Sequence, residues 1–228
     1  MRTPPYNLVL SEIDDAAFVE AVVPDLAGHP AGLELPGVMG PEPGIEVFAS
    51  AWSAWTGRPA RRSMGERISR LERVRSVARP AGAMRAAVEQ DRALLAAWLT
   101  AFALEAVPDE PPPETDPAID RYLGGGSLRG LRLWEDGGSV VSLACFGGPT
   151  PNGSRVGPVY TPPELRKRGY ATALVADLSA ERLASGRRFC FLFTDLANPT
   201  SNHIYQEIGY EPVRDVAVYR FDAPREPS

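Results

Sequence analysis

The turn "RKRGYA" at residues 166–171 has the residue types needed to bind an anion. It precedes a segment whose apolar residues recur at helical spacing. The first N–H groups of a helix have no internal partner and carry the positive end of the helix dipole, so they attract phosphate groups. Gly169 lets a ligand approach the backbone closely, which makes the turn a workable diphosphate cradle. Positive charge is added by Arg166, Lys167 and Arg168. By itself the hexapeptide is also typical of an arginine-rich, solvated helix start.

A second polar pattern follows the next predicted strand. Asn198 before Pro199 is a good N-cap with proline at the first helical position, so a helix is predicted to begin there. The polar side chains at i, i+3, i+4 and i+7 of this helix are Asn198, Ser201, Asn202 and Tyr205. A polar stripe with a phenol on it indicates a binding or catalytic face. The alternative is that Asn198 only caps the helix and that Tyr205 only packs.

Both patterns need strands and helices to position them. Apolar runs bounded by turn residues predict strands at "LRLWE", "SVVSLACF", "RVGPVYT" and "RFCFLFT", with "DGG" as a hairpin turn between the first two. Pro162 and Pro163 have no N–H group, so the third strand should end before them. The segment "DRALLAAWLTAFALEA" has an apolar stripe at helical spacing that should pack on the sheet. The prolines and acids of residues 107–117 forbid a helix and predict an exposed loop.

The two patterns together resemble the GCN5-related N-acetyltransferase (GNAT) family. The family's acetyl-CoA signature, Arg/Gln-x-x-Gly-x-Gly/Ala, is similar to "RKRGYA". Its second signature contains Asn, Ala, Tyr and Gly-Phe in that order and is similar to "NPTSNHIYQEIGY", where Ser201 replaces the alanine and Tyr210 the phenylalanine. The resemblance covers roughly residues 79–221, and "GAMRAAVEQD" looks like the family's first strand and the entry to its first helix.

The resemblance implies an α+β fold, with a mixed, mostly antiparallel sheet flanked by helices. It also implies that the main chain of residues 159–161 pairs with the pantetheine arm and that the N–H groups of residues 167–172 hold the pyrophosphate. The two strands that flank the cofactor should splay apart, often at a bulge. Tyr205 matches the family's general acid, and Asn198 looks like a pantetheine contact. The expected cofactor-binding residues are Val159, Tyr160, Thr161, Arg166, Lys167, Arg168, Gly169, Tyr170, Ala171, Thr172, Asn198, Ser201 and Tyr205.

The implied activity is direct transfer of an acetyl group from acetyl-CoA to a primary amine of a small molecule or a protein. A catalytically silent acyl-CoA-binding or sensor module of the same fold is the alternative. Cys145 and Cys190 lie in the middle of predicted strands without a neighbouring histidine, so neither is expected to be a nucleophile. A base or a water relay must take the proton of the amine. Spacing does not choose among the candidate bases Glu105, Asp109, Glu110 and Asp195.

Composition excludes several other classes of protein. The 228 residues carry a formal net charge of −5, which argues against non-specific nucleic-acid binding. No apolar stretch is long enough to span a membrane, and the first residues lack the apolar region of a signal peptide, so a cytoplasmic protein without membrane association is expected. Two cysteines and two histidines offer no metal-ligand spacing, so no metal site is expected.

Residues 1–78 are expected to form a separate, structural segment, and residues 79–228 the acetyltransferase domain. The resemblance suggests that the first segment is a truncated, degenerate acetyltransferase-like half, because a strand-like run and the helix "IEVFASAWSAW" recur there. At the equivalent turn it offers "GPEPGI", whose prolines and acid would repel a diphosphate. Trp52 and Trp55 are both expected in the core. The conformation of residues 66–78 is left open, since apolar residues there have near-helical spacing where a strand is expected.

Overall fold

The computed structural model of the protein describes residues 7–106, 114–148 and 150–223. The chain forms two compact units. The first comprises the chain up to Ile68, together with Thr194–Asn198 and the residues from Pro212 onward, and the second comprises Ser69–Phe193 and Pro199–Glu211. The C-terminal strand returns to the first unit and pairs there antiparallel with an early strand. The boundary after residue 78 stays a prediction.

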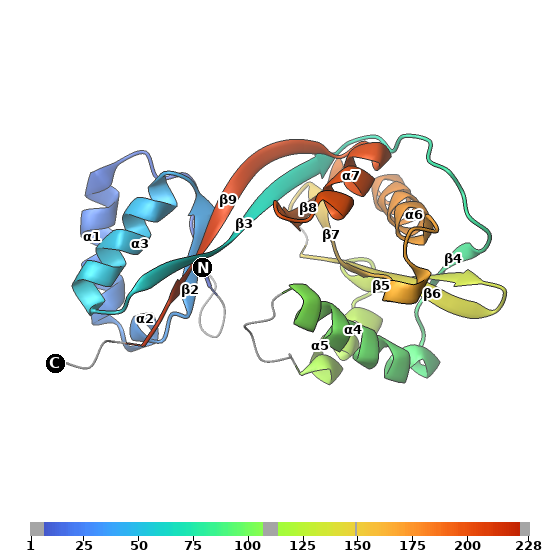
Figure 1. The fold of residues 1–228 in the computed structure, drawn as a ribbon, viewed down its shortest axis with the longest axis horizontal. Coiled ribbons are helices and arrows are strands. Elements are labelled where there is room, and N and C mark those ends of the chain that lie inside the picture. The colour runs from blue at the N-terminus through green and yellow to red at the C-terminus, as the bar shows by residue number, and fades with distance from the viewer. Residues whose placement is uncertain (1–6, 107–113, 149, 224–228) are drawn as a thin grey trace. The chain divides into compact units, whose positions relative to one another are not determined.

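The first unit is a small sheet with helices packed on it (Figure 1). Its strand order is β1-β2-β9-β3, and one end of each of β3 and β9 belongs to the second unit. Its elements are β1 (Leu8–Val9), α1 (Ala16–Gly28), α2 (Pro30–Leu33), β2 (Gly37–Pro41), α3 (Gly44–Thr56), β3 (Ala60–Leu71) and β9 (Glu211–Phe221).

Helix α3 is the predicted "IEVFASAWSAW" helix, and it ends at Gly57, a glycine in the left-handed conformation with a φ of 70°. Trp52 is fully buried and stacks on Phe221 with ring centroids 5.5 Å apart. The prediction for Trp55 is wrong, because its side chain is 63% exposed. The buried face of α3 is narrow and includes Ile45, Phe48 and Trp52. Trp55, three residues after Trp52, lies at the edge of this face.

The second unit contains both sequence patterns. Its strand order is β8-β7-β6-β5-β4, with antiparallel pairs except for the parallel pair β7–β8. The mixed, mostly antiparallel sheet flanked by helices confirms the predicted fold class. Its elements are β4 (Ala83–Ala86), the 3₁₀ helix η1 (Glu89–Asp91), α4 (Arg92–Ala106), α5 (Thr115–Leu123), β5 (Gly130–Asp136), β6 (Ser139–Gly147), β7 (Gly153–Tyr160), the 3₁₀ helix η2 (Pro163–Leu165), α6 (Tyr170–Ala184), β8 (Phe189–Asp195) and α7 (Pro199–Ile208).

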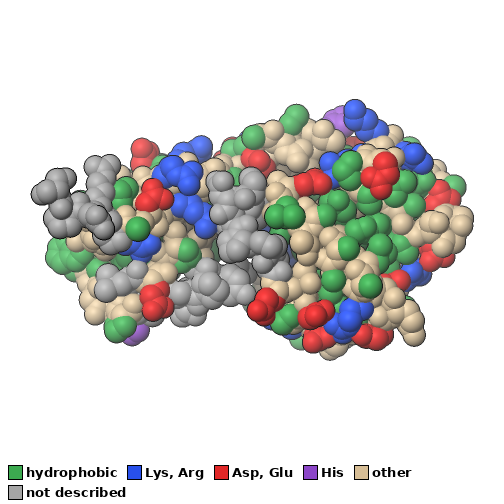
Figure 2. Space-filling model, turned by 60° about the horizontal axis from the view of Figure 1, so that its bottom comes forward, with side chains coloured by type: hydrophobic (Ala, Val, Ile, Leu, Met, Phe, Trp, Pro, Cys, Tyr) green, Lys and Arg blue, Asp and Glu red, His purple; other side chains and the backbone are tan. Residues whose placement is uncertain are grey.

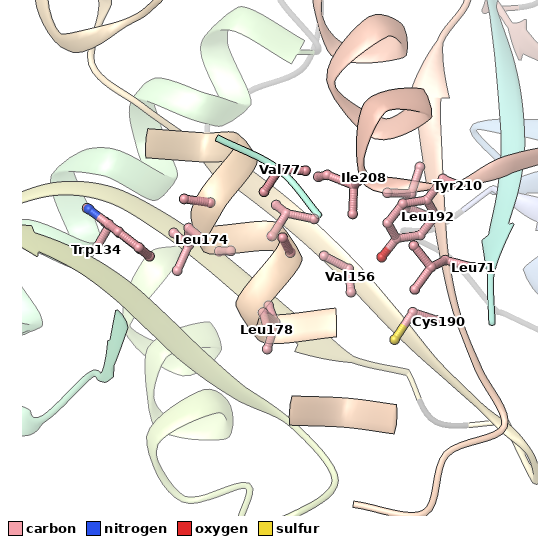
Figure 3. Close-up of a cluster of buried hydrophobic side chains, with 14 of the residues drawn as sticks. Leu71, Val77, Trp134, Val156, Leu174, Leu178, Cys190, Leu192, Ile208 and Tyr210 are labelled. Carbon is pink, nitrogen blue, oxygen red and sulfur yellow. The ribbon is translucent and has the colours of Figure 1, made fainter. Parts of the chain in front are cut away.

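Helices cover both faces of this sheet (Figure 1). Helix α6 covers one face and forms the core that Figure 3 shows, in which Leu174 and Leu178 of α6 meet Val156, Cys190 and Leu192 of the sheet. Helices α4 and α5 cover the other face, with a core of their own. Because side chains alternate along a strand, each strand contributes to both cores. In β6, Ala144 and Phe146 face α6, whereas Leu143 and Cys145 face α4 and α5.

Helix α4 is apolar on nearly all sides, which exceeds what the predicted stripe requires. Leu95 and Leu99 are buried as predicted, but Leu104 is 50% exposed. Figure 2 shows hydrophobic side chains gathered on the side of this unit that carries α4 and α5, with charged side chains around them.

The predicted loop at residues 107–117 is corrected at its C-terminal end. Residues 107–113 lie outside the described residues, but α5 begins at Thr115, so Thr115–Pro117 form the first turn of a helix. Proline is tolerated there because first-turn N–H groups have no intrahelical partner. For residues 66–78, the structure shows the end of β3 at Leu71 and then irregular chain, with Val77 buried against α6 and α7.

Candidate functional site

Strands β7 and β8 pair over only the first part of their length. The described residue pairs are Gly153–Phe189, Ser154–Cys190 and Arg155–Phe191, although both strands continue beyond them. Past Arg155 and Phe191 the facing backbone edges of these two strands therefore form a split in the sheet. A split of this kind exposes N–H and C=O groups that can pair with an extended ligand.

A β-bulge in β7 marks the same place. Ala144 of β6 pairs with Val159 and Phe146 pairs with Val156, so Gly157 and Pro158 together stand opposite one residue. Gly157 has a φ of 126°, a conformation that residues other than glycine rarely adopt. A bulge bends the strand that carries it, so it accounts for the divergence of β7 from β8.

The split opens beside the N-terminus of α6, where the structure places the "RKRGYA" turn. Gly169 is the N-cap of α6 with a φ of 82°, and Lys167 also has a positive φ, of 63°. Left-handed residues alternating with ordinary ones turn successive N–H groups toward a common point. Among the described residues no side chain caps α6, which leaves the first N–H groups of the helix to an anion. A Cβ built at Gly169 would meet only the ring of Pro80, at 3.8 Å, among the described residues.

Arg166 does not point its charge at this turn. Its Nη2 lies 2.9 and 2.7 Å from the two carboxylate oxygens of Glu105 on α4, and its Nε donates to the carbonyl of Thr161 at 2.8 Å. The guanidinium also lies 5.8 Å from the ring centre of Tyr160. Arg166 therefore joins α4 to the end of β7. The other two cations of the turn, Lys167 and Arg168, are exposed, and the Nη2 of Arg168 donates to the carbonyl of Glu164 at 3.2 Å.

The main chain at residues 159–161 lies at the split, but its groups are not equivalent. The carbonyl of Tyr160 accepts a hydrogen bond from the Ser142 hydroxyl of β6 at 3.1 Å, which directs it toward β6. Successive residues of a strand direct their backbone groups to opposite edges, so Val159 and Thr161 face the split. Since Arg166 occupies the carbonyl of Thr161, both backbone groups of Val159 and the N–H of Thr161 remain for a ligand.

The other residues of the turn are placed as follows. The hydroxyl of Tyr170 donates to Asp136 at 2.6 Å, so this side chain packs toward the β5–β6 hairpin while its backbone opens α6. Ala171 and Thr172 continue the first turn of α6. Thr161 is buried, and its hydroxyl lies 2.8 Å from that of Ser142.

Helix α7 begins at Pro199, as the Asn-Pro sequence predicts. Asn198 is exposed, and its N–H donates to the carbonyl of Asp195 at 3.1 Å. Ser201 and Tyr205 are both half-buried, and Tyr205 packs against the core beneath α6. Burial raises the pKa of Tyr205 to about 12, which keeps its phenol protonated at neutral pH. Within the described residues, its hydroxyl has no hydrogen-bond acceptor.

Tyr210 departs from the family's usual phenylalanine, and the structure gives its hydroxyl a buried partner. It lies 2.8 Å from the hydroxyl of Ser179 on α6. The ring of Tyr210 meets that of Tyr205 edge to face, with centroids 5.8 Å apart. The N–H of Tyr210 also donates to the carbonyl of Tyr205 at 2.9 Å, so this residue holds the end of α7 against α6.

The candidate bases are not brought together at the split. Glu105 is paired with Arg166, and the Oδ1 of Asp195 accepts the N–H of Ala197 at 2.8 Å. Asp109 and Glu110 lie outside the described residues. Both cysteines, Cys145 and Cys190, are buried free thiols. Burial raises the pKa of Cys145 and raises that of Cys190 to about 12. Neither thiol is therefore a thiolate at neutral pH.

No group of three or more His, Cys, Asp or Glu side chains that could hold a metal ion occurs among residues 7–106, 114–148 and 150–223. In the same ranges, no helix is both long and apolar enough to cross a membrane.

Comparisons with known proteins point to one fold family. Residues 144–219, which contain the split, the turn and both sequence patterns, match the family described as FR47-like protein. A GCN5-related N-acetyltransferase from Kribbella flavida is similar with a TM-score of 0.56 and 18% identity, over 82% of this chain and 67% of that chain. The fold is that of the GNAT acetyltransferases. An acetyltransferase of the GNAT family from Colwellia psychrerythraea has a TM-score of 0.61 and 10% identity, over 91% of this chain and 73% of that chain. No curated protein sequence matches the chain.

The family match and the GNAT fold confirm the resemblance that the two motifs indicate. The suggestion that residues 1–78 are a degenerate copy of the same fold stays a prediction. Sequence reasoning missed two features of the candidate site: the pairing of Arg166 with Glu105 and the bond between Tyr210 and Ser179. The first could not be seen because the partners belong to elements far apart in sequence. The second had a signal, the tyrosine in place of the usual phenylalanine.

Proposed function

We propose that the protein is an N-acetyltransferase that moves an acetyl group from acetyl-CoA to a primary amine. The observation that carries the proposal is the split between β7 and β8 beside the uncapped N-terminus of α6. An extended pantetheine arm needs a free strand edge, and a diphosphate needs a cluster of N–H groups. The split supplies the free strand edge and the turn supplies the cluster of N–H groups, in adjacent segments of the chain.

The residues present fit the diphosphate. Gly169 is exposed and holds a left-handed conformation, and a Cβ there would make only an ordinary contact with Pro80, so the backbone stays accessible. Lys167 and Arg168 add two exposed positive charges. The N–H groups from Lys167 to Thr172 would hold the diphosphate, while Val159 and the N–H of Thr161 would pair with the arm. Asn198 and Ser201 would contact the arm from the start of α7.

When bound, acetyl-CoA supplies the acetyl group as a thioester. The nitrogen of the amine bonds to the acetyl carbon, and the bond from that carbon to sulfur breaks. Tyr205 acts as the general acid that gives its proton to the departing sulfur. Its raised pKa suits this role, because the phenol stays protonated over the whole neutral range and loses its proton only as the pH rises toward about 12. The proton of the amine passes to solvent or to a base that remains unassigned.

Direct transfer is favoured over a covalent acyl-enzyme. Cys145 and Cys190 are buried in the two cores and neutral, so neither can attack a thioester. Glu105 is held by Arg166 and does not serve as a free base in this arrangement. Positioning of the two substrates can supply much of the rate enhancement without a strong base.

A silent acyl-CoA-binding module is the competing function, and Tyr205 distinguishes the two. A binding module does not require a protonated phenol whose hydroxyl has no hydrogen-bond acceptor among the described residues. We expect Tyr205→Phe to lower kcat about 10²-fold or more while the affinity for acetyl-CoA stays nearly unchanged, since the phenol acts only as the sulfur leaves. Thiol release and calorimetric binding measure the two quantities. Full turnover of the variant would show that Tyr205 is not the acid.

The proposal as a whole is tested by thermal unfolding with acetyl-CoA, with coenzyme A and with ATP as a phosphate control. A ligand that binds only the folded protein adds about 2.7 kcal/mol of stability at one hundred times its dissociation constant. We expect both coenzyme A species to raise the Tm by several degrees and ATP to have little effect. If neither coenzyme A species stabilises the protein, the turn at Gly169 does not bind the cofactor, and only the fold assignment survives.

A further inference from the structure

Strand β8 carries a row of three phenylalanines that the proposed cofactor site does not use. Phe189, Phe191 and Phe193 alternate with Cys190 and Leu192, which are buried beneath α6. The three rings therefore lie on the opposite face of the sheet, the face that α4 and α5 cover further along. Their centroids are 6.2 and 6.3 Å apart, and all three side chains are half-buried.

The row runs from the paired part of β8 into the split. Phe189 stands opposite Gly153, and its ring packs there so closely that a Cβ on Gly153 would lie 2.3 Å from it. Phe191 belongs to the last described pair of the two strands. Phe193 lies beyond that pair, beside the split, with the guanidinium of Arg155 at 4.9 Å from its ring centre. Phe189 is thus packed within the paired part of the two strands, whereas Phe193 borders the split and has Arg155 against its ring.

The other strand of the split contributes aromatic rings on the same face. Tyr160, the last residue of β7, belongs to the core beneath α4, and its ring lies 5.9 Å from that of Trp98. Aromatic side chains of both β7 and β8 therefore flank the split on the side away from α6. The turn proposed to bind the diphosphate lies at the start of α6, on the other side of the sheet, which leaves this face for a second substrate.

We propose that this face is the acceptor site and that the acceptor is a primary amine carrying an aromatic group. The inference rests on the proposed acetyl transfer and adds the substrate class. Aromatic rings attract other rings in edge-to-face or offset contacts. The guanidinium groups of Arg155 and Arg166 already lie against the rings of Phe193 and Tyr160, so ring-to-ring contact rather than attraction of a cation would select the acceptor. An amine with a ring attached by a short chain makes that contact with its nitrogen directed into the split toward the acetyl carbon.

The test uses the full chain, acetyl-CoA and three probe amines, with thiol release as the measure of transfer. The probes are 2-phenylethylamine, 2-cyclohexylethylamine, which has a similar shape without the aromatic face, and spermidine, which is polycationic. We expect kcat/KM for 2-phenylethylamine to exceed that for 2-cyclohexylethylamine about twofold to tenfold, the range of one aromatic pair. We expect spermidine to be the poorest of the three.

Two matched variants locate the effect on β8. Phe193→Leu keeps an apolar side chain but removes the ring at the split, so it should abolish the preference for the aromatic probe. Phe189→Leu removes a ring of the same row that is packed on Gly153, so it should leave that preference unchanged. The affinity of both variants for acetyl-CoA, measured by calorimetry, should equal that of the natural protein, which separates acceptor binding from cofactor binding.

The failures can be told apart. If spermidine or 2-cyclohexylethylamine is the better acceptor, or if Phe193→Leu keeps the preference, the acceptor class is wrong and the acetyl transfer stands. If acetyl-CoA binds but none of the amines reacts or binds, the aromatic acceptor is likewise excluded. If acetyl-CoA itself does not bind, the proposed function fails and the inference falls with it.

Discussion

Two helix N-termini of the molecule follow the same strand–turn pattern but differ in what lies against them. Helix α3 follows β2 in the first unit, and α6 follows β7 in the second. A Cβ at Gly44, the first residue of α3, would lie 2.8 Å from both the Cβ and the carbonyl oxygen of Ile13. A Cβ at Gly169, before α6, would lie no closer than 3.8 Å to the ring of Pro80. The first helix terminus is filled by the protein's own chain, and the second is open.

The charges follow the same division. Near the start of α3 stand two acids, Glu42 and Glu46, with Glu42 paired to Arg62. At the start of α6 stand two exposed cations, Lys167 and Arg168. A helix dipole is present at both ends, so the dipole alone does not make a ligand site. What distinguishes the α6 turn is that described atoms come no closer than 3.8 Å to a Cβ at Gly169, and that positive side chains stand beside it.

The largest difference between the two turns should appear in the stability of a variant at Gly44. We expect Gly44→Val to lower the free energy of unfolding by about 2 kcal/mol or more, because its side chain would collide with backbone atoms of Ile13. Urea unfolding measures the loss. The affinity for coenzyme A should not change, and a large loss of affinity with full stability would show that the α3 turn also takes part in binding.

The bond between Ser179 and Tyr210 sharpens the comparison, because it ties α6 to the end of α7. We expect Ser179→Ala to cost about 1–3 kcal/mol in urea unfolding, since the Tyr210 hydroxyl would stay buried without a partner. Tyr210→Phe should cost less, because a serine in a helix can bond to a backbone carbonyl.

The double variant Ser179→Ala/Tyr210→Phe provides the control for that prediction. Removing both hydroxyls leaves no unpaired polar group, so the double variant should be more stable than Ser179→Ala alone. Strictly additive losses would mean that the two hydroxyls do not interact.

A substitution at Gly169 should change mainly the affinity for coenzyme A. Gly169→Ala places a side chain in a left-handed conformation, at a cost of about 1 kcal/mol. If the turn relaxes to a negative φ, its N–H groups point elsewhere, and we expect the affinity for coenzyme A to fall about tenfold. Isothermal titration calorimetry gives the affinity. Unchanged binding would remove Gly169 from the proposed diphosphate site.

The smallest expected effects are on the affinity for coenzyme A when Lys167 or Arg166 of the turn is replaced. Lys167→Gln should weaken coenzyme A binding about threefold at low salt, and the difference should shrink as salt is added, since exposed charges are screened. Arg166→Gln should have less effect on that affinity, because Arg166 is engaged by Glu105 and Thr161. The reverse order would mean that Arg166 leaves Glu105 when the cofactor binds.

Much of the fold could be predicted from local pattern. The apolar alternation of the strands, the Asn198–Pro199 start of α7 and the glycines at Gly57 and Gly209 fix these elements through interactions of near neighbours. The burial of Trp52 but not Trp55 was not predictable at the same level. It depends on which side of α3 meets β9, a strand more than 150 residues later.

The sequence by itself determined the residues of the candidate site, their order and the conformations they require. Gly169 must be glycine for its positive φ, and two prolines after Thr161 stop β7, whatever the rest of the chain does. Only the tertiary structure decided where β7 leaves β8, that Arg166 binds Glu105, and that the phenylalanines of β8 border the split. These are relations between groups far apart in the chain, and they arise when strands and helices pack, which no local pattern contains.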